Sequence, residues 1–287
     1  MCLSPDMIDV LLISLVLIVL ICASYTDLRT KEVPDWLSYG FIVAALGVRG
    51  IYSFQDGWQV IVSGLLGFAA FYLLALLFYY THQWGGGDSK LLMGMGAALG
   101  ISYPFTELSF TLLWFLLLLL FSGALYGMIW LGVIAFQRRN CLLPELRSLL
   151  GNHKKFHFGM GFGSVLFLGA GFFVNSLLLI VTLLVIIYYL LLFLVAVQSC
   201  CFISERDTKT LTEGDWLAEE VVVHGKTLLK KKALTKNDLE KLYNQKISSV
   251  QIKEGIPFVP SFLIAYLFLL LGKDLVPTIL GKAFGLS

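Results

Sequence analysis

Long apolar runs separated by short polar breaks dominate this chain. Eight stretches are apolar enough to be read as membrane-spanning helices, at about 8–25, 37–54, 58–80, 90–103, 107–136, 158–174, 176–200 and 257–272. A helix needs roughly 20 apolar residues to cross the hydrocarbon core of a bilayer. Two of these stretches, 90–103 and 158–174, are short and rich in glycine, so they need protein neighbours to cover them. The pattern predicts an all-α multi-pass membrane protein with about eight transmembrane helices, although 158–200 could also be one kinked element.

Composition agrees with this fold class. The chain has 287 residues, of which 58% are hydrophobic and 14% are charged, and its mean hydropathy is +0.83. Soluble domains carry roughly 25% charged residues, so a wholly soluble protein is excluded and the lipid bilayer is an expected partner. A net charge of +2 gives no indication of nucleic-acid binding.

One block of the chain, 204–255, has the composition of a soluble domain. Thr235 followed by Asp238 has the spacing of a helix capping box, and apolar residues then recur at helical spacing. The stretches 220–224 and 249–253 are typical of short strands. We therefore expect a small α+β insert on the cytoplasmic side, which divides the chain into a transmembrane catalytic domain (1–203), the insert (204–255) and a C-terminal transmembrane helix with its tail (256–287). Lysines 230–232 of the insert form either a contact with anionic headgroups or a solvated turn.

Basic residues are distributed unevenly between the two sides of the membrane. If the eight spans alternate in direction, one side receives most of the lysines and arginines together with the whole 204–255 block. The other side receives only Arg49, Lys273 and Lys282. Cytoplasmic loops carry the excess of basic residues, so the first side is predicted to be cytoplasmic and both termini to lie outside.

Two aspartates stand where long apolar runs end. Asp27 follows the run 8–25, and Asp88 follows the run 60–80 and three glycines. A carboxylate at the depth of a bilayer is costly, and it is a candidate for function by default. The predicted topology puts both acids on the cytoplasmic side. Two carboxylates that come close share a proton near neutral pH, so that one can activate water while the other donates to a carbonyl oxygen, as in aspartic proteases.

The glycines Gly85, Gly86 and Gly87 precede Asp88 directly. Three successive glycines disfavour a regular helix and allow a kink and the close approach of another peptide backbone. They therefore predict a pocket for a substrate strand beside Asp88. The alternative is an ordinary loop between two spans, in which Asp88 caps a helix that begins near residue 89. Lys90 either lowers the pKa of Asp88 or meets a headgroup phosphate, and Asp35 is expected to cap the next helix after Pro34.

Other chemistries lack support in the sequence. The five cysteines form no C-x-x-C pair, and the histidines in the predicted cytoplasmic loops lack metal-ligand spacing. No phosphate-binding loop and no Ser/His/Asp set is visible. We therefore expect neither a metal nor a cofactor.

Both acid-bearing segments resemble the motifs of one enzyme family. The stretch 27–37, DLRTKEVPDWL, resembles the first aspartate motif of type IV prepilin peptidases and archaeal preflagellin peptidases, and 85–92, GGGDSKLL, resembles their GxGD motif followed by lysine. The stretch 94–100 also fits their pattern, and 255–260, GIPFVP, is similar to an element of archaeal members.

The resemblance carries expectations about the site and the reaction. It implies a membrane aspartic endopeptidase with Asp27 and Asp88 as the catalytic pair and Gly85–Gly87 and Lys90 around them. Such enzymes cut a short basic leader from pilin or archaellin precursors at the cytoplasmic face of the cell membrane. The cysteine-rich N-terminal domain that bacterial members often carry is missing here, so a peptidase without N-methylation activity is expected.

Two alternative functions would use the same two aspartates in a different way. A GxGD protease of the presenilin or signal-peptide-peptidase type would cut within a transmembrane helix, with its acids deeper in the bilayer. An ion-coupled transporter would use them as a relay, but it predicts internal repeats and polar residues in mid-span, which the sequence does not show convincingly.

Overall fold

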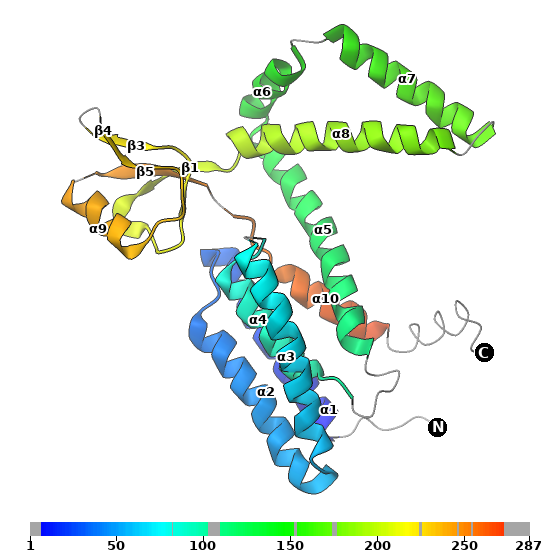
Figure 1. Ribbon diagram of the computed structural model, residues 1–287, viewed down its shortest axis with the longest axis vertical. Helices are drawn as coiled ribbons and strands as arrows, with labels where there is room; N and C mark the ends of the chain where they lie inside the picture. Colours follow the sequence, from blue (N-terminus) through cyan, green and yellow to red (C-terminus); the bar gives the residue numbers. More distant parts are fainter. Residues whose placement is uncertain are drawn as a thin grey trace. The chain divides into compact units, whose positions relative to one another are not determined.

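A computed structural model of the chain (Figure 1) describes residues 7–81, 83–102, 110–151, 154–173, 177–223, 226–245, 247–253 and 255–272. The start of the predicted span 107–136 and the junction of 158–174 with 176–200 lie outside these residues. The chain divides into two compact units, Met1–Met128 with Ile256–Ser287, and Ile129–Gly255.

The first unit is a bundle of helices. It contains α1 (Met7–Thr30), α2 (Asp35–Asp56), α3 (Gln59–Tyr80), α4 (Gly86–Leu99), the first part of α5 (Thr111–Gln137) and α10 (Pro260–Leu271). Helix α4 packs against α2 and α3, and α1 contacts α2, α4 and α10. One apolar core runs through the bundle, with the fully buried rings of Phe41, Phe115 and Phe262 among its members.

The predicted fold class is confirmed as a multi-pass helical membrane protein with a small strand-bearing region. Among the described residues, five helices are long and apolar enough to cross a membrane, namely α1, α2, α3, α5 and α8 (Leu177–Cys200). Helix α4 has 14 residues and is about 21 Å long at 1.5 Å per residue, so it is too short to cross a core of about 30 Å.

Glycines let α4 approach α3 closely. A β-carbon at Gly67 would collide with the carbonyl oxygen of Gly96, and one at Gly96 would collide with the carbonyl oxygen of Gly67. The two backbones therefore touch without side chains between them. This contact explains why the glycine-rich stretch is helical here despite its low intrinsic helix propensity.

A buried arginine closes the far end of α4. Arg49 is buried in α2, and its predicted place on the outer side of the membrane stays a prediction. Its guanidinium donates to the last carbonyls of α4, with Nε 2.9 Å from Ala97 O and Nη2 2.7 Å from Ala98 O and 3.0 Å from Leu99 O. Its Nη1 donates to Ser63 Oγ at 2.6 Å. Helix carbonyls that lack an intrahelical partner are thus satisfied, which fixes the helix that begins next to Asp88.

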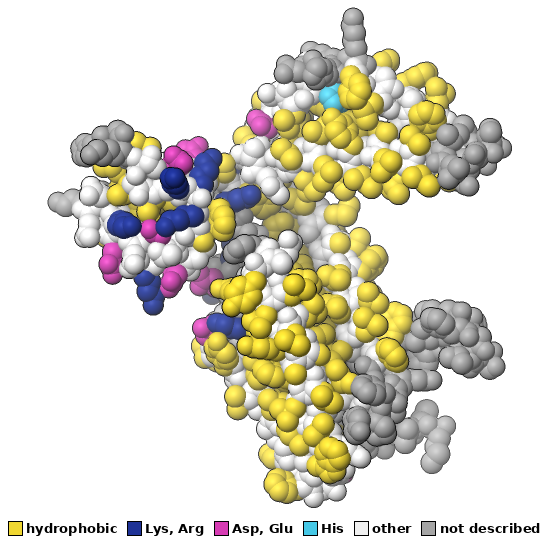
Figure 2. All heavy atoms as spheres, viewed as in Figure 1, with side chains coloured by type: hydrophobic (Ala, Val, Ile, Leu, Met, Phe, Trp, Pro, Cys, Tyr) yellow, Lys and Arg dark blue, Asp and Glu magenta, His cyan; other side chains and the backbone are white. Residues whose placement is uncertain are grey.

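The second unit contains the end of α5, three further helices and the insert. Helix α8 packs against α6 (Arg139–Gly151) and α7 (Lys154–Phe173), and the chain then enters the insert. Figure 2 shows charged side chains gathered over the strands, whereas the helices present mainly hydrophobic side chains on this face. This difference agrees with the predicted change from membrane to soluble composition. The three-part division at 203 and 255 stays a prediction.

The insert is α+β, as predicted. Strands β1 (Ile203–Asp207), β5 (Ser249–Lys253) and β2 (Trp216–Leu217) form an antiparallel sheet in the order β1-β5-β2. Strands β3 (Val221–Val223) and β4 (Lys226–Leu229) form a hairpin, and α9 (Lys236–Asn244) follows it. In β5 the alternate residues Val250 and Ile252 are buried in the insert's own core, as the period of two requires.

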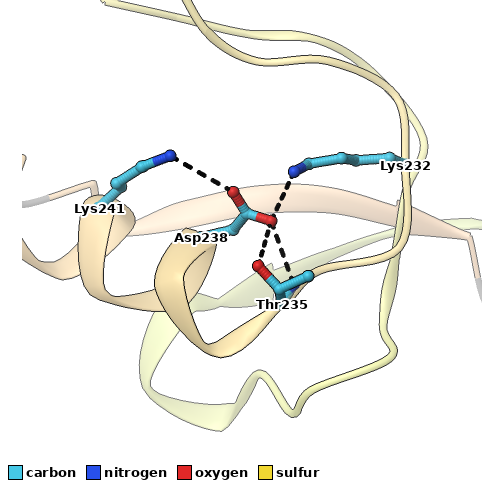
Figure 3. A network of polar contacts seen from close by, with 4 residues as sticks. All are labelled: Lys232, Thr235, Asp238 and Lys241. Atoms are coloured by element: carbon cyan, nitrogen blue, oxygen red, sulfur yellow. Dashed lines mark hydrogen bonds and ion pairs between the residues drawn. The ribbon is translucent and has the colours of Figure 1, made fainter.

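Asp238 organises the start of α9 (Figure 3). Its buried carboxylate accepts hydrogen bonds from Thr235 N at 3.2 Å and Thr235 Oγ1 at 2.7 Å, as the predicted capping box requires, and it pairs with Lys232 Nζ at 2.7 Å. Lys241 lies 3.8 Å away on the other carboxylate oxygen. The hydrogen bond from Lys232 is the largest cause that lowers the pKa of Asp238 to about 2. Lys232 therefore serves the insert's own fold.

We expect Asp238→Asn to destabilise the insert by about 1–2 kcal/mol at neutral pH, because it removes the charge that Lys232 meets and weakens the cap. The native pKa is lowered, so the stabilisation is complete above the unfolded value of 3.8 and is lost as the pH falls through about 2. Hydrogen exchange of α9 amides in the full chain measures the effect. Lys236→Gln, which loosens only an exposed pair with Glu213, is the matched control and should change little.

Candidate active site

Asp27 lies in the last turn of α1, on the face that packs into the bundle. Val16, Leu20 and Ala23 precede it on that face at helical spacing, and Asp27 itself is only 6% exposed. Its Oδ2 accepts a hydrogen bond from the backbone N–H of Val259 at 2.9 Å. The helix ends at Thr30, three residues later, and Lys31 then adopts a left-handed φ of 58°. The carboxylate is therefore held on the protein side of α1 and has a fixed donor.

Asp88 lies in the first turn of α4 and is half-buried. Burial and, after it, the negative charge of Asp27 together raise the pKa of Asp88 to about 7, although a backbone hydrogen bond from Gly85 opposes them. At neutral pH this acid therefore holds its proton for much of the time. The negative charge of Asp27 thus favours the protonated form of Asp88.

The three glycines have different surroundings. Gly85 precedes α4 with extended backbone, whereas Gly86 and Gly87 are the first two residues of the helix. The expected irregular backbone is therefore confined to the start of the helix, and Asp88 does not cap it. A β-carbon at Gly87 would lie 3.2 Å from the β-carbon of Val33, in the loop that follows Asp27. Gly87 thus lets the two acid-bearing segments pack directly on each other.

Lys90 forms an ion pair with Asp35, and the causes that shift the pKa of Asp88 do not include Lys90. The predicted contact of Lys90 with a headgroup phosphate stays a prediction. The Nζ of Lys90 lies 2.6 Å from Asp35 Oδ1 and 5.0 Å from the centre of the Tyr39 ring. Burial lowers the pKa of Lys90, but the hydrogen bond and charge of Asp35, together with Tyr39, outweigh burial and raise it. Asp35 is the first residue of α2, and Pro34 rather than Asp35 occupies the capping position. The expected cap is therefore wrong, and the ion pair instead joins the starts of α2 and α4.

Three contributors to the site escaped the sequence analysis as site residues. The first is the backbone N–H of Val259, 232 residues from its acceptor. The second is an aromatic cluster in which Trp84 packs on Phe258 and Phe262 at ring-centre distances of 5.4 and 5.7 Å. The third is Tyr126 of α5, which feels the charge of Asp27. The GIPFVP stretch was a signal for the first two, whereas an isolated tyrosine in an apolar run gives none.

The described residues contain no group of three His, Cys, Asp or Glu side chains arranged to hold a metal ion. What the site provides is a pair of carboxylates, one with a fixed backbone donor and one with a pKa near neutrality. This fold and this site define a helical membrane protein with an acid pair suited to proton transfer.

Comparison with known proteins shows that part of the chain is similar to one family. Residues 14–131, from α1 into α5, match the profile of the type IV leader peptidase family, and they include both aspartates. The preflagellin peptidase of Methanococcus voltae is 32% identical over 115 residues, which cover 37% of this chain and 48% of that protein. The preflagellin peptidase of Methanocaldococcus jannaschii is 32% identical over 79 residues, 27% of this chain and 33% of that protein.

These matches confirm the resemblance to the prepilin and preflagellin peptidases that the motifs indicated. The chain spans less than half the length of the curated relatives that it matches. The roles of the individual residues stay predictions and are argued below.

Proposed function

We propose that this chain is a membrane-embedded aspartic endopeptidase that removes a short basic leader from pilin- or archaellin-like precursors. The proposed active site faces the cytoplasm, and Asp27 and Asp88 are its catalytic pair. The observation that carries the proposal is the direct packing of the two acid-bearing segments at Gly87 and Val33, within the stretch that matches leader peptidases.

The surroundings of the acids favour one distribution of roles. Asp27 accepts a hydrogen bond from Val259 N–H, and such a bond stabilises the charged form of a carboxylate. Asp88 has a pKa of about 7 because of burial and the charge of Asp27. In the resting pair the single proton therefore resides on Asp88. Asp27 acts as the general base and Asp88 as the general acid, an order that the sequence alone left open.

The proposed reaction needs only water and the scissile peptide bond. The water oxygen bonds to the carbonyl carbon while Asp27 takes a proton from the water and Asp88 gives its proton to the carbonyl oxygen. The carbon–nitrogen bond of the resulting gem-diol then breaks. Asp27 delivers its proton to the leaving amine, and a diol hydroxyl returns a proton to Asp88. The pair ends with one proton, as it began.

The substrate class follows from the surroundings of the site. Asp27 lies at the end of a long apolar helix and is followed by a polar loop at 31–34. If the apolar helix of a precursor lies along the enzyme's transmembrane helices, the peptide bond just before that helix lies at the same depth in the membrane as Asp27. Gly85, in extended backbone before α4, gives the cleavage-site strand access to Asp88.

Leader removal by the purified chain in liposomes, followed by N-terminal sequencing of the product, tests the proposal. The expected product begins at the residue just before or at the start of the precursor's apolar helix. A cut within the apolar helix would favour an intramembrane protease of the presenilin type instead. Ion-dependent uptake without any peptide cleavage would favour a transporter.

The pH dependence of the reaction follows from the state of Asp88. Its pKa of about 7 is raised from 3.8, so the acid form persists through the weakly acidic range and is lost above pH 7. We expect kcat/KM for leader removal to fall by about tenfold per pH unit on the alkaline side of that value. Asp238→Asn, in the insert, should leave the alkaline limb of the pH profile of kcat/KM unchanged. A rate that stays constant up to pH 9 would contradict the role of Asp88 as the acid.

A further inference from the structure

We propose that the segment Phe258–Val259, at the start of α10, is a positioning element of the catalytic site. The backbone N–H of Val259 orients the carboxylate of Asp27, and the ring of Phe258 anchors that N–H to the loop that precedes Asp88. This inference rests on the proposed function and adds a third segment, from the C-terminal part of the chain, to the two acid-bearing motifs.

The donor is available because of its place in the helix. Val259 is the N-cap residue of α10, and the first N–H groups of a helix have no partner within that helix. The next residue, Pro260, has no N–H at all. The start of a helix also favours a negative charge. The carboxylate of Asp27 occupies this position at 2.9 Å, in a contact that is buried from solvent.

The ring of Phe258 fixes the position of this donor. It packs 5.4 Å from the ring of Trp84, which directly precedes Gly85 and the rest of the Asp88 motif. On its other side it lies over Gly123 of α5, where an added β-carbon would come within 2.7 Å of the ring. Val259 thus contacts Asp27 through its backbone N–H, and Phe258 contacts the loop before Asp88 through its ring.

Two hydroxyl groups complete the anchor. Ser122 Oγ of α5 donates to the carbonyl oxygen of Ser261 at 3.1 Å, and Ser261 Oγ donates to the carbonyl oxygen of Phe258 at 2.6 Å. Both serines are buried. The first turn of α10 is therefore tied to α5 by a hydrogen bond as well as by the Phe258–Gly123 contact, which restricts how far the Val259 N–H can move.

Among the described residues, Asp88 on α4 and Tyr126 on α5 have pKa values that the charge of Asp27 affects. Removal of the Val259 donor changes neither of them directly. A carboxylate that loses a hydrogen bond to its charged form takes up a proton more readily. The pH dependence of the reaction therefore reports the hydrogen bond separately from any general effect on folding.

A matched pair of substitutions at one position tests the inference. Val259→Pro removes the N–H and keeps a φ of −57°, which lies within the range of proline, whereas Val259→Ala keeps the N–H. We expect Val259→Pro to lower kcat by about 10–100-fold relative to Val259→Ala. The acidic limb of its kcat/KM–pH profile should also lie about one to two pH units higher, because a hydrogen bond to a charged group contributes an energy equivalent to a pKa shift of that size. KM for the precursor should change less than twofold.

A second pair of variants acts through the anchor and covers the case in which the proline variant does not fold. Gly123→Ala pushes against the ring of Phe258, while Gly127→Ala, one turn further along α5, faces open space. We expect Gly123→Ala to show the same upward movement of the acid limb with about a tenfold lower kcat, because small displacements of catalytic groups are costly. Gly127→Ala should match the wild type.

Equal kcat and equal pH profiles within each pair would overturn the positioning role. If Asp27→Asn is inactive while both pairs behave alike, the protease proposal stands and only this inference fails. If Asp27→Asn retains full activity, the protease proposal itself fails.

Discussion

Asp27→Asn and Asp88→Asn are each expected to lower the rate of leader removal by about 10²–10⁴-fold, the contribution typical of a positioned general acid or base. Asparagine keeps the size and polarity of the side chain but can neither take up nor release the proton. Asp27 accepts from Val259 N–H, and an amide oxygen can accept the same bond, so the fold should survive the change. The measurement is the fraction of precursor cleaved over time by purified enzyme in liposomes.

Asp56→Asn is the matched control for this pair. Asp56 is an exposed acid at the last residue of α2, away from the start of that helix, where Lys90 and Asp35 meet. The same chemical change there should leave the cleavage rate within about twofold of the wild type, because the residue lies outside the proposed site. Full processing by either Asp27→Asn or Asp88→Asn would refute the catalytic assignment.

The second large effect, a loss of folding stability, is expected for a substitution of Arg49, which lies at the other end of α4 from the proposed catalytic residue Asp88. Arg49→Ala removes a buried guanidinium that donates to carbonyls at the end of α4 and to Ser63. These acceptors would be left buried without a donor, so we expect a loss of about 3–5 kcal/mol of folding free energy. Reversible unfolding of the purified protein in detergent micelles measures this loss, and hydrogen exchange should locate it at α4.

Two further variants make the Arg49 result specific. Arg49→Lys keeps the charge but cannot reproduce the planar fork, so an intermediate loss is expected. Arg139→Ala removes an exposed arginine and should change stability by less than about 0.5 kcal/mol. A stability of Arg49→Ala equal to that of Arg139→Ala would show that the carbonyls at the end of α4 do not need the cap.

The sequence predicted the helical membrane class and the insert because both depend on local pattern. Apolar runs near 20 residues, the period of two in β5 and the spacing of Thr235 and Asp238 are all readable without tertiary contacts. Asp27 also continues the buried face of α1 at helical spacing. The length of α4 was less predictable, because its end is determined by contacts with Arg49 and Gly67 in other helices.

Long-range partners could not be read from local pattern. Arg49 looked like an outer-side charge, since nothing near it in the sequence indicates the α4 carbonyls some fifty residues away. Lys90 looked like a partner for Asp88 because the two are close in sequence, yet in the fold it forms an ion pair with Asp35. Val259 contributes a backbone group, which no side-chain motif reveals.

The account depends on Asp27 and Asp88 sharing one site, and a thiol cross-link between these positions tests this most directly. In a background without the five native cysteines, Asp27→Cys and Asp88→Cys are combined and treated with the shortest bis-maleimide. Asp27→Cys with Asp56→Cys is the control, since α2 has 22 residues and spans about 33 Å from its start to Asp56. We predict rapid intramolecular cross-linking of positions 27 and 88 and none of positions 27 and 56. If each cysteine at 27 and 88 is labelled singly but the pair never cross-links, the shared site does not exist.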